Sequence, residues 1–299
     1  MKTGYPCINT GIGCTPNTTF RLASYCSDRL IGSITENIAC LKKILDYNVK
    51  NNLLFFRIGS SVIPFASHDV CQFDWLEFFT PQFKELGRYI KKHNIRISMH
   101  PDQFIVLNSP KADVVARSIR ELEYHAQFLD ALELDTTAKI QLHVGGAYGD
   151  KKQATKRFVE TYKQLDSSVK RRLVIENDDR IYSAQDCLAL YQETGVPLLF
   201  DTLHQEVLNN GENLLEIMTK LFATWSINDG IPMIDYSTQD PQGRRGKHAI
   251  SLDKEHFAQF IETTRDLDFD IMLELKDKEK NALQALKILQ CLRPLNKSA

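Results

Sequence analysis

The chain has 299 residues, of which 43% are hydrophobic and 25% are charged, and its formal net charge at pH 7 is −1. This composition is typical of a globular protein, and the balanced charge excludes a protein that attracts nucleic acid over its whole surface. No apolar stretch approaches the roughly 20 residues of a membrane-spanning helix, and the polar N-terminal segment does not resemble a signal peptide. We therefore expect a cytoplasmic protein with no membrane partner.

Apolar runs and amphipathic stretches alternate along the chain. Strands are predicted near residues 2–8, 53–58, 95–99, 138–144, 172–176, 197–201, 231–236 and 270–274. Helices are predicted near residues 34–47, 81–93, 111–133, 151–165, 183–194, 211–224, 253–265 and 278–291. Eight strands that are each followed by a helix favour an α/β fold with a single (β/α)₈ TIM barrel, one domain over residues 1–299. A doubly wound open sheet is the alternative, but the GxGxxG turn that binds dinucleotides is absent, so we expect no nucleotide cofactor.

The cysteines give no sign of a metal site or a disulfide framework. Their number is odd, they are widely scattered, and no CxxC pair occurs. We expect all of them to be buried free thiols. They are Cys7, Cys14, Cys26, Cys40, Cys71, Cys187 and Cys291.

A histidine or a carboxylate stands at or just beyond the end of most of the predicted strands. The carboxyl ends of the strands of a TIM barrel form one face of the molecule, and catalytic residues lie on that face. Buried charges at repeated strand ends are costly unless they are paired or bind a metal ion. We therefore expect these side chains to converge on one site. They are His68, His100, His143, Glu176, Asp201, His204, Asp235, His248 and Glu274.

This mixture of imidazoles and carboxylates suits Mn²⁺, Zn²⁺ or Fe²⁺ better than Mg²⁺. It offers more ligands than one ion needs, so we expect two or three ions. Glu176 lies near the middle of the strand order and is the expected bridging ligand. A centre with several metal ions activates water and stabilises both the attacking and the leaving oxygen of a phosphoryl displacement. Phosphodiester hydrolysis is therefore the first reaction class to consider.

Short motifs spread over most of the chain resemble the UV damage endonuclease family, whose relatives include the endonuclease IV and xylose-isomerase-like barrels. These motifs are Gly4–Asn9, Phe56–Pro64 leading to His68, Met99–Phe104, His143–Gly149 and Glu176–Asp179. The resemblance implies a metal-dependent endonuclease, commonly using manganese, that nicks damaged double-stranded DNA immediately 5′ of pyrimidine dimers and some other lesions. We expect it to act as a monomer, because DNA must reach an open barrel mouth.

The resemblance also implies roles for individual residues. The strand-end histidines and carboxylates would be metal ligands, with Glu176, Asp201 and Glu274 catalytic. Gln103 and Phe104 match an amide–aromatic pair that probes the lesion, since a ring can replace lost base stacking and an amide can bond base edges. Tyr5 and Asn9 match residues that line the lesion pocket.

One strand departs from the family pattern. The family usually carries a lysine, often modified and close to the metal ions, and a histidine two residues later. This chain has Met233 and Asp235 at those positions. Asp235 could still bind a metal ion through oxygen, but Met233 cannot replace a charged side chain, so one metal site is expected to be altered.

A basic loop follows the same strand. Arg244, Arg245 and Lys247 stand immediately before His248 and would lie on the active face of a barrel. Arginine pairs well with phosphate oxygens, so we expect this loop to bind the DNA backbone.

Two other functions remain open. A metal-dependent sugar isomerase uses the same kind of barrel, although it would leave Gln103, Phe104 and the basic loop unexplained. A catalytically impaired protein that only binds DNA lesions is suggested by Met233 and Asp235.

Overall fold

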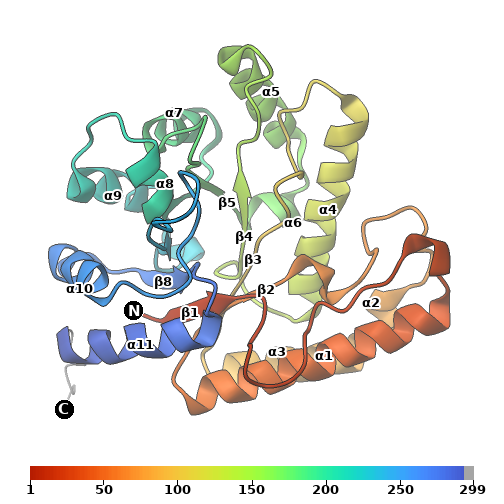
Figure 1. Cartoon of the computed structure of the whole chain (residues 1–299). Helices are drawn as coiled ribbons and strands as arrows, with labels where there is room; N and C mark the ends of the chain where they lie inside the picture. Colours follow the sequence, from red (N-terminus) through yellow and green to blue (C-terminus); the bar gives the residue numbers. More distant parts are fainter. Residues whose placement is uncertain (293–299) are drawn as a thin grey trace.

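In a computed structural model that describes residues 1–292, eight parallel strands form a closed barrel in chain order (Figure 1). The strands are β1 (Thr3–Pro6), β2 (Phe55–Ile58), β3 (Arg96–Met99), β4 (Lys139–His143), β5 (Leu173–Glu176), β6 (Leu198–Asp201), β7 (Met233–Tyr236) and β8 (Asp270–Leu273). Pairing between β1 and β8 closes the barrel. The predicted TIM barrel is therefore confirmed.

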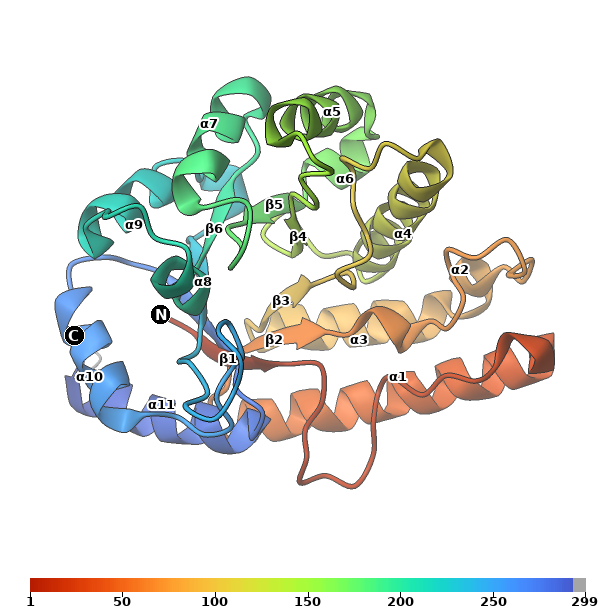
Figure 2. The same ribbon diagram turned by 45° about the horizontal axis from the view of Figure 1, so that its top comes forward.

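The helices surround the strands, and Figure 2 shows most of them in a ring outside the barrel. They are α1 (Ser27–Lys50), α2 (Trp75–Phe78), α3 (Thr80–Lys92), α4 (Ala112–Ala131), α5 (Lys151–Gln164), α6 (Ser167–Lys170), α7 (Ala184–Thr194), α8 (Thr202–Val207), α9 (Leu214–Phe222), α10 (Lys254–Thr263) and α11 (Lys278–Leu292). All eight predicted helices are present. The first is longer than expected, because α1 begins at Ser27 and projects beyond the barrel beside α3. None of the helices within residues 1–292 has the length and apolar character of a membrane span.

The strands position the site because residues two apart on a strand point to the same side of the sheet. One buried apolar cluster contains Phe55, Val174, Leu199, Met233 and Met272. Two residues further along the same strands or just past them stand Arg57, Glu176, Asp201, Asp235 and Glu274. A layer of charged side chains therefore lies directly above an apolar floor, at the carboxyl end of the barrel.

The structure corrects the expectation that all seven cysteines are buried free thiols. Cys14, in the loop after β1, forms a disulfide with Cys40 of α1. Their Cα atoms are 5.9 Å apart although the residues are 26 positions apart in sequence, so only the tertiary packing of the loop on α1 brings them together. Among the five remaining cysteines, which are free, only Cys187 is buried; Cys26 and Cys291 are exposed.

Candidate metal centre

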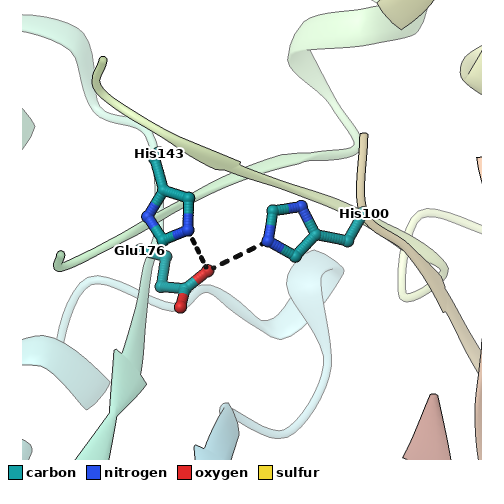
Figure 3. A group of neighbouring side chains, drawn as sticks. All are labelled: His100, His143 and Glu176. Carbon is teal, nitrogen blue, oxygen red and sulfur yellow. Dashed lines mark ion pairs between the residues drawn. The ribbon is translucent and has the colours of Figure 1, made fainter. Parts of the chain in front are cut away.

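Glu176, the last residue of β5, is buried at the centre of the charged layer. His100 Nε2 lies 3.4 Å and His143 Nε2 3.5 Å from its Oε2 atom, and His204 Nδ1 lies 3.2 Å from its Oε1 atom. Figure 3 shows the first two rings directed at the carboxylate. Two ligands of one ion, with bonds of about 2.0–2.2 Å, are themselves about 3.0–3.5 Å apart. The three imidazoles and Glu176 therefore have the spacing of metal ligands.

Asp201 and His204 are brought together by one helical turn. Asp201 ends β6 and caps α8, where its Oδ1 atom accepts the backbone N–H of His204 at 2.7 Å. This turn directs the imidazole of His204 back over the barrel towards Glu176. The second oxygen, Asp201 Oδ2, is buried and has no hydrogen-bond partner among the described residues. Buried polar atoms are rarely left unpaired, and a bound cation would satisfy this one.

Three overlapping sets of side chains could each hold a cation, and within each set the ligand atoms lie within 4.8 Å of one another. The sets are His100, His143 and Glu176; Glu176, Asp201 and His204; and Asp201, Asp235 and Glu274. Glu176 and Asp201 each belong to two sets. The structure thus brings together seven of the nine predicted ligands, and their chemistry fits divalent ions that accept both imidazole and carboxylate.

The charges of the centre are unbalanced in a way that a cation would correct. Burial raises the pKa of Asp201 to about 6. The nearby carboxylates of Glu176 and Glu274 also raise this pKa, whereas His204 lowers it. Burial would lower the pKa of His204, but Asp201 and Glu176 outweigh it and raise that pKa to about 11. Burial lowers the pKa of His143, which keeps this imidazole neutral and able to bind a metal ion.

Arg57 and Gln141 are two buried members of the centre that the sequence motifs did not single out. Arg57 Nη2 donates to Asp235 Oδ1 at 2.6 Å and to Gln141 Oε1 at 2.7 Å, and Nη1 donates to Glu274 Oε1. Gln141 Nε2 donates to Glu176 Oε2 and to Asp235 Oδ2, both at 2.5 Å. An arginine within the apolar run Leu54–Ile58 was the available sequence signal, because a charge in a buried strand needs a partner.

The two remaining predicted ligands lie further out. His248 is at the rim, where its Nδ1 atom bonds with Ser237 Oγ and the backbone oxygen of Glu274, and its ring centroid is 5.8 Å from that of His204. His68 is exposed on the loop after β2, and its Nδ1 atom accepts the backbone N–H of Val70. Among the described residues His68 belongs to none of the three sets.

An open groove of about 650 Å³ leads to the centre and is lined by His143, His204 and His248. Gln103 and Phe104 also line it, from the loop between β3 and α4, and the Phe104 side chain is 70% exposed. An exposed aromatic ring at the edge of a groove is available for stacking against a ligand.

Some of the basic side chains at the groove already form an ion pair or a hydrogen bond within the protein. Arg244 and Lys247 line the groove, but Lys247 pairs with Asp240 at 2.8 Å. Arg245 is instead turned to the backbone oxygen of Val207. Arg180 and Lys276 also line the groove, and no sequence motif pointed to them.

Tyr5 and Asn9 do not line this groove. Both are buried; Tyr5 Oη donates to Asn48 Oδ1 at 2.7 Å, and Asn9 Nδ2 donates to Tyr5 Oη at 2.9 Å. In this structure they join the start of the β1–α1 loop to helix α1. Neither side chain is placed in the groove for the expected contact with a lesion.

Comparison with known proteins identifies the family. The model of the UV-endonuclease UvdE family matches residues 2–299. A UV DNA damage endonuclease of Clostridium perfringens is 39% identical over 300 residues, which cover 100% of this chain and 72% of the relative. The crystal structure of SacUVDE superposes with a TM-score of 0.93 at 42% identity and covers 98% of this chain and 99% of the other.

A more distant match supports the fold alone. The crystal structure of endonuclease IV from Thermus thermophilus superposes with a TM-score of 0.59 at 14% identity, and it covers 85% of this chain and 94% of the other. The matches to the family model and to the two closer proteins confirm the resemblance predicted from the sequence and the enzyme class, a DNA repair endonuclease. The chain belongs to the UV-endonuclease UvdE family.

Proposed function

We propose that this endonuclease uses divalent metal ions, Mn²⁺ foremost, to cut one strand of damaged double-stranded DNA immediately 5′ of a UV photoproduct. The observation that carries the proposal is the carboxylate of Glu176, which faces His100, His143 and His204 at 3.2–3.5 Å at the base of an open groove. The 5′ position of the cut is what the resemblance to the UV damage endonuclease family implies.

The ligands that we propose for the ions are those that the barrel gathers. His100, His143 and Glu176 would hold one ion, and Glu176, Asp201 and His204 a second, so that Glu176 bridges the two. A divalent ion bound there would activate water and stabilise charge on the attacking and leaving oxygens. Glu274 and His248 would complete the rim of the centre.

The groove supports a DNA substrate rather than a small sugar. Arg244, Arg180 and Lys276 line it and would neutralise phosphates on either side of the cut. Phe104 would stack where a damaged base pair leaves a gap, and Gln103 would bond the exposed base edges. A sugar isomerase would need an enclosed pocket and would leave this exposed aromatic without a role.

We also propose that the chain works as a single barrel domain over residues 1–299 and as a monomer. The groove lies open at the carboxyl end of the barrel. A duplex could therefore approach without a second subunit.

The test combines binding and cutting on one substrate. A duplex with a single cyclobutane pyrimidine dimer and a 5′ label on the damaged strand is incubated with the protein and Mn²⁺, with an intact duplex of the same sequence as control. We expect one product that ends immediately 5′ of the dimer, and none with EDTA. Binding without incision would favour the lesion-binding alternative. The absence of both binding and incision would contradict the proposal.

A further inference from the structure

The third of the three ligand sets differs from the other two, because a cation of the protein already occupies it. Arg57 bonds with Asp235 and with Glu274, two of the three carboxylates in the set. The side chains of Arg57 and Asp235 are 2% and 0% exposed, so water does not weaken their attraction as it would at the surface. The guanidinium is a permanent positive charge inside the centre.

Both oxygens of Asp235 are engaged by cationic or amide donors of the protein. Its Oδ1 atom accepts from Arg57 at 2.6 Å, and its Oδ2 atom accepts from Gln141 at 2.5 Å. Asp201, its partner in the β6–β7 register, is equally buried, yet Asp201 Oδ2 has no hydrogen-bond partner within residues 1–292. Of these two neighbouring carboxylates, only Asp201 has an oxygen without a hydrogen-bond partner in the described part of the chain.

Met233 provides no charge below Asp235. It lies two residues earlier on β7 and is fully buried in the apolar floor with Val174 and Leu199. In the described part of the chain no second cationic side chain forms an ion pair with Asp235, so Arg57 alone compensates it.

We propose that Arg57 takes the place of one divalent ion, so that the centre holds two metal ions and Asp235 is the partner of Arg57 instead of a metal ligand. This inference rests on the metal dependence of the proposed function. Gln141 connects the two parts of the centre, because its amide donates to both Asp235 and Glu176. Arg57 and Gln141 thereby hold the bridging carboxylate in position.

The charges of such a centre balance when a phosphodiester is bound. Two divalent ions and Arg57 carry five positive charges, and the four carboxylates of the ligand sets, once all are ionised, carry four negative charges. The remaining positive charge matches the single negative charge of a phosphodiester. A third divalent ion would leave an excess of three positive charges and would compete with Arg57 for Asp235 Oδ1 and Glu274 Oε1.

The experiment counts Mn²⁺ ions per chain in the full-length protein, by equilibrium dialysis followed by elemental analysis. Two isosteric substitutions form a matched pair: Asp235→Asn and Asp201→Asn. We expect two ions in the unchanged protein, two in Asp235→Asn, and a count lowered by about one in Asp201→Asn. An unchanged protein with three ions, or an Asp235→Asn variant that loses an ion, would overturn the inference.

Arg57→Met tests the same idea in the opposite direction. Removal of the guanidinium frees oxygens of Asp235 and Glu274, so we expect the count to rise from two to three; a count that stays at two would contradict the role of Arg57. If this variant does not fold, the matched pair of aspartate substitutions decides the question.

An unchanged protein that binds no Mn²⁺ at all would contradict the proposed function itself. A wrong count in a protein that still shows Mn²⁺-dependent incision would contradict only the role of Arg57.

Discussion

At the residue scale the centre depends on Glu176. Its two oxygens face imidazoles from three different segments. Gln141 Nε2 donates a hydrogen bond of 2.5 Å to one of these oxygens, Oε2. Burial would raise the pKa of Glu176, but His143, His100 and His204 outweigh burial and lower that pKa well below its usual range. Glu176 is therefore an ionised carboxylate at neutral pH, which a bridging metal ligand must be.

Replacing this carboxylate by its amide should remove the bridge. In Glu176→Gln we expect a lower Mn²⁺ content and a loss of incision greater than about 100-fold, since even residues that only support a metal ligand change activity by about 10- to 100-fold. Elemental analysis and the incision assay measure the two effects. Unchanged metal content and activity would show that the bridge lies elsewhere.

Metal binding should release protons in a pH-dependent manner. The pKa of His204 is raised to about 11, so at pH 7.5 its imidazole is protonated before metal binds and must then lose that proton. The pKa of Asp201 is raised to about 6, so below pH 6 this carboxyl is protonated as well. We expect release of about one proton at pH 7.5 and about two at pH 5.5 from these groups, and weaker Mn²⁺ binding as the pH falls.

Calorimetry in buffers of different ionisation enthalpy counts these protons. His204→Gln provides the control, because it removes the larger contribution at pH 7.5. Equal proton release by this variant and the unchanged protein would contradict the assignment.

At the scale of elements, the loops that follow the strands determine how the groove meets DNA. The β3–α4 loop presents Gln103 and Phe104, and the β7–α10 loop presents Arg244. Gly246 lets the second loop approach the β5–α7 loop: its φ is +79°, and a Cβ atom there would lie 2.1 Å from Asp179 Oδ2. These two loops are therefore packed against each other without room for a side chain at Gly246.

The β3–α4 loop should carry the preference for damaged DNA. For Gln103→Ala combined with Phe104→Ala we expect the ratio of damaged to intact duplex affinity to fall about tenfold or more, since stacking on an aromatic contributes about 1–3 kcal/mol per base. Metal content should be retained. Ile227→Ala removes another exposed apolar side chain, 93% exposed, before β7 at the opposite end of the barrel, and serves as control. Unchanged discrimination in the double variant would exclude these residues as the probe.

The basic loop offers a matched pair of arginines. Arg244 lines the groove, whereas Arg245 bonds with the backbone oxygen of Val207. We expect Arg244→Ala to weaken binding to all DNA sequences and to reduce the slope of log affinity against log salt concentration by about 0.9. Arg245→Ala should change the slope less. Equal slopes for the two variants would contradict the different roles.

At the scale of the whole molecule, the sequence was sufficient for the barrel and for the convergence of strand ends. Alternating periodicities predict eight strands and helices, and the register of a parallel barrel then brings His143, Glu176 and Asp201 to one face. The pairing of Arg57 with Asp235 could not be predicted, because it joins β2 to β7 across the barrel interior. The Cys14–Cys40 disulfide likewise depends on how the β1–α1 loop packs on α1, and the contact of Tyr5 with Asn48 depends on how β1 packs on the same helix.

The most direct test of the metal centre is an anomalous-scattering map from crystals of the Mn²⁺-loaded protein. We expect a manganese peak within about 2.0–2.3 Å of ligand atoms of Glu176, His100 and His143, and a second peak beside Glu176 and Asp201. Manganese peaks only at other places, in protein that still incises damaged DNA, would contradict the assignment of this centre.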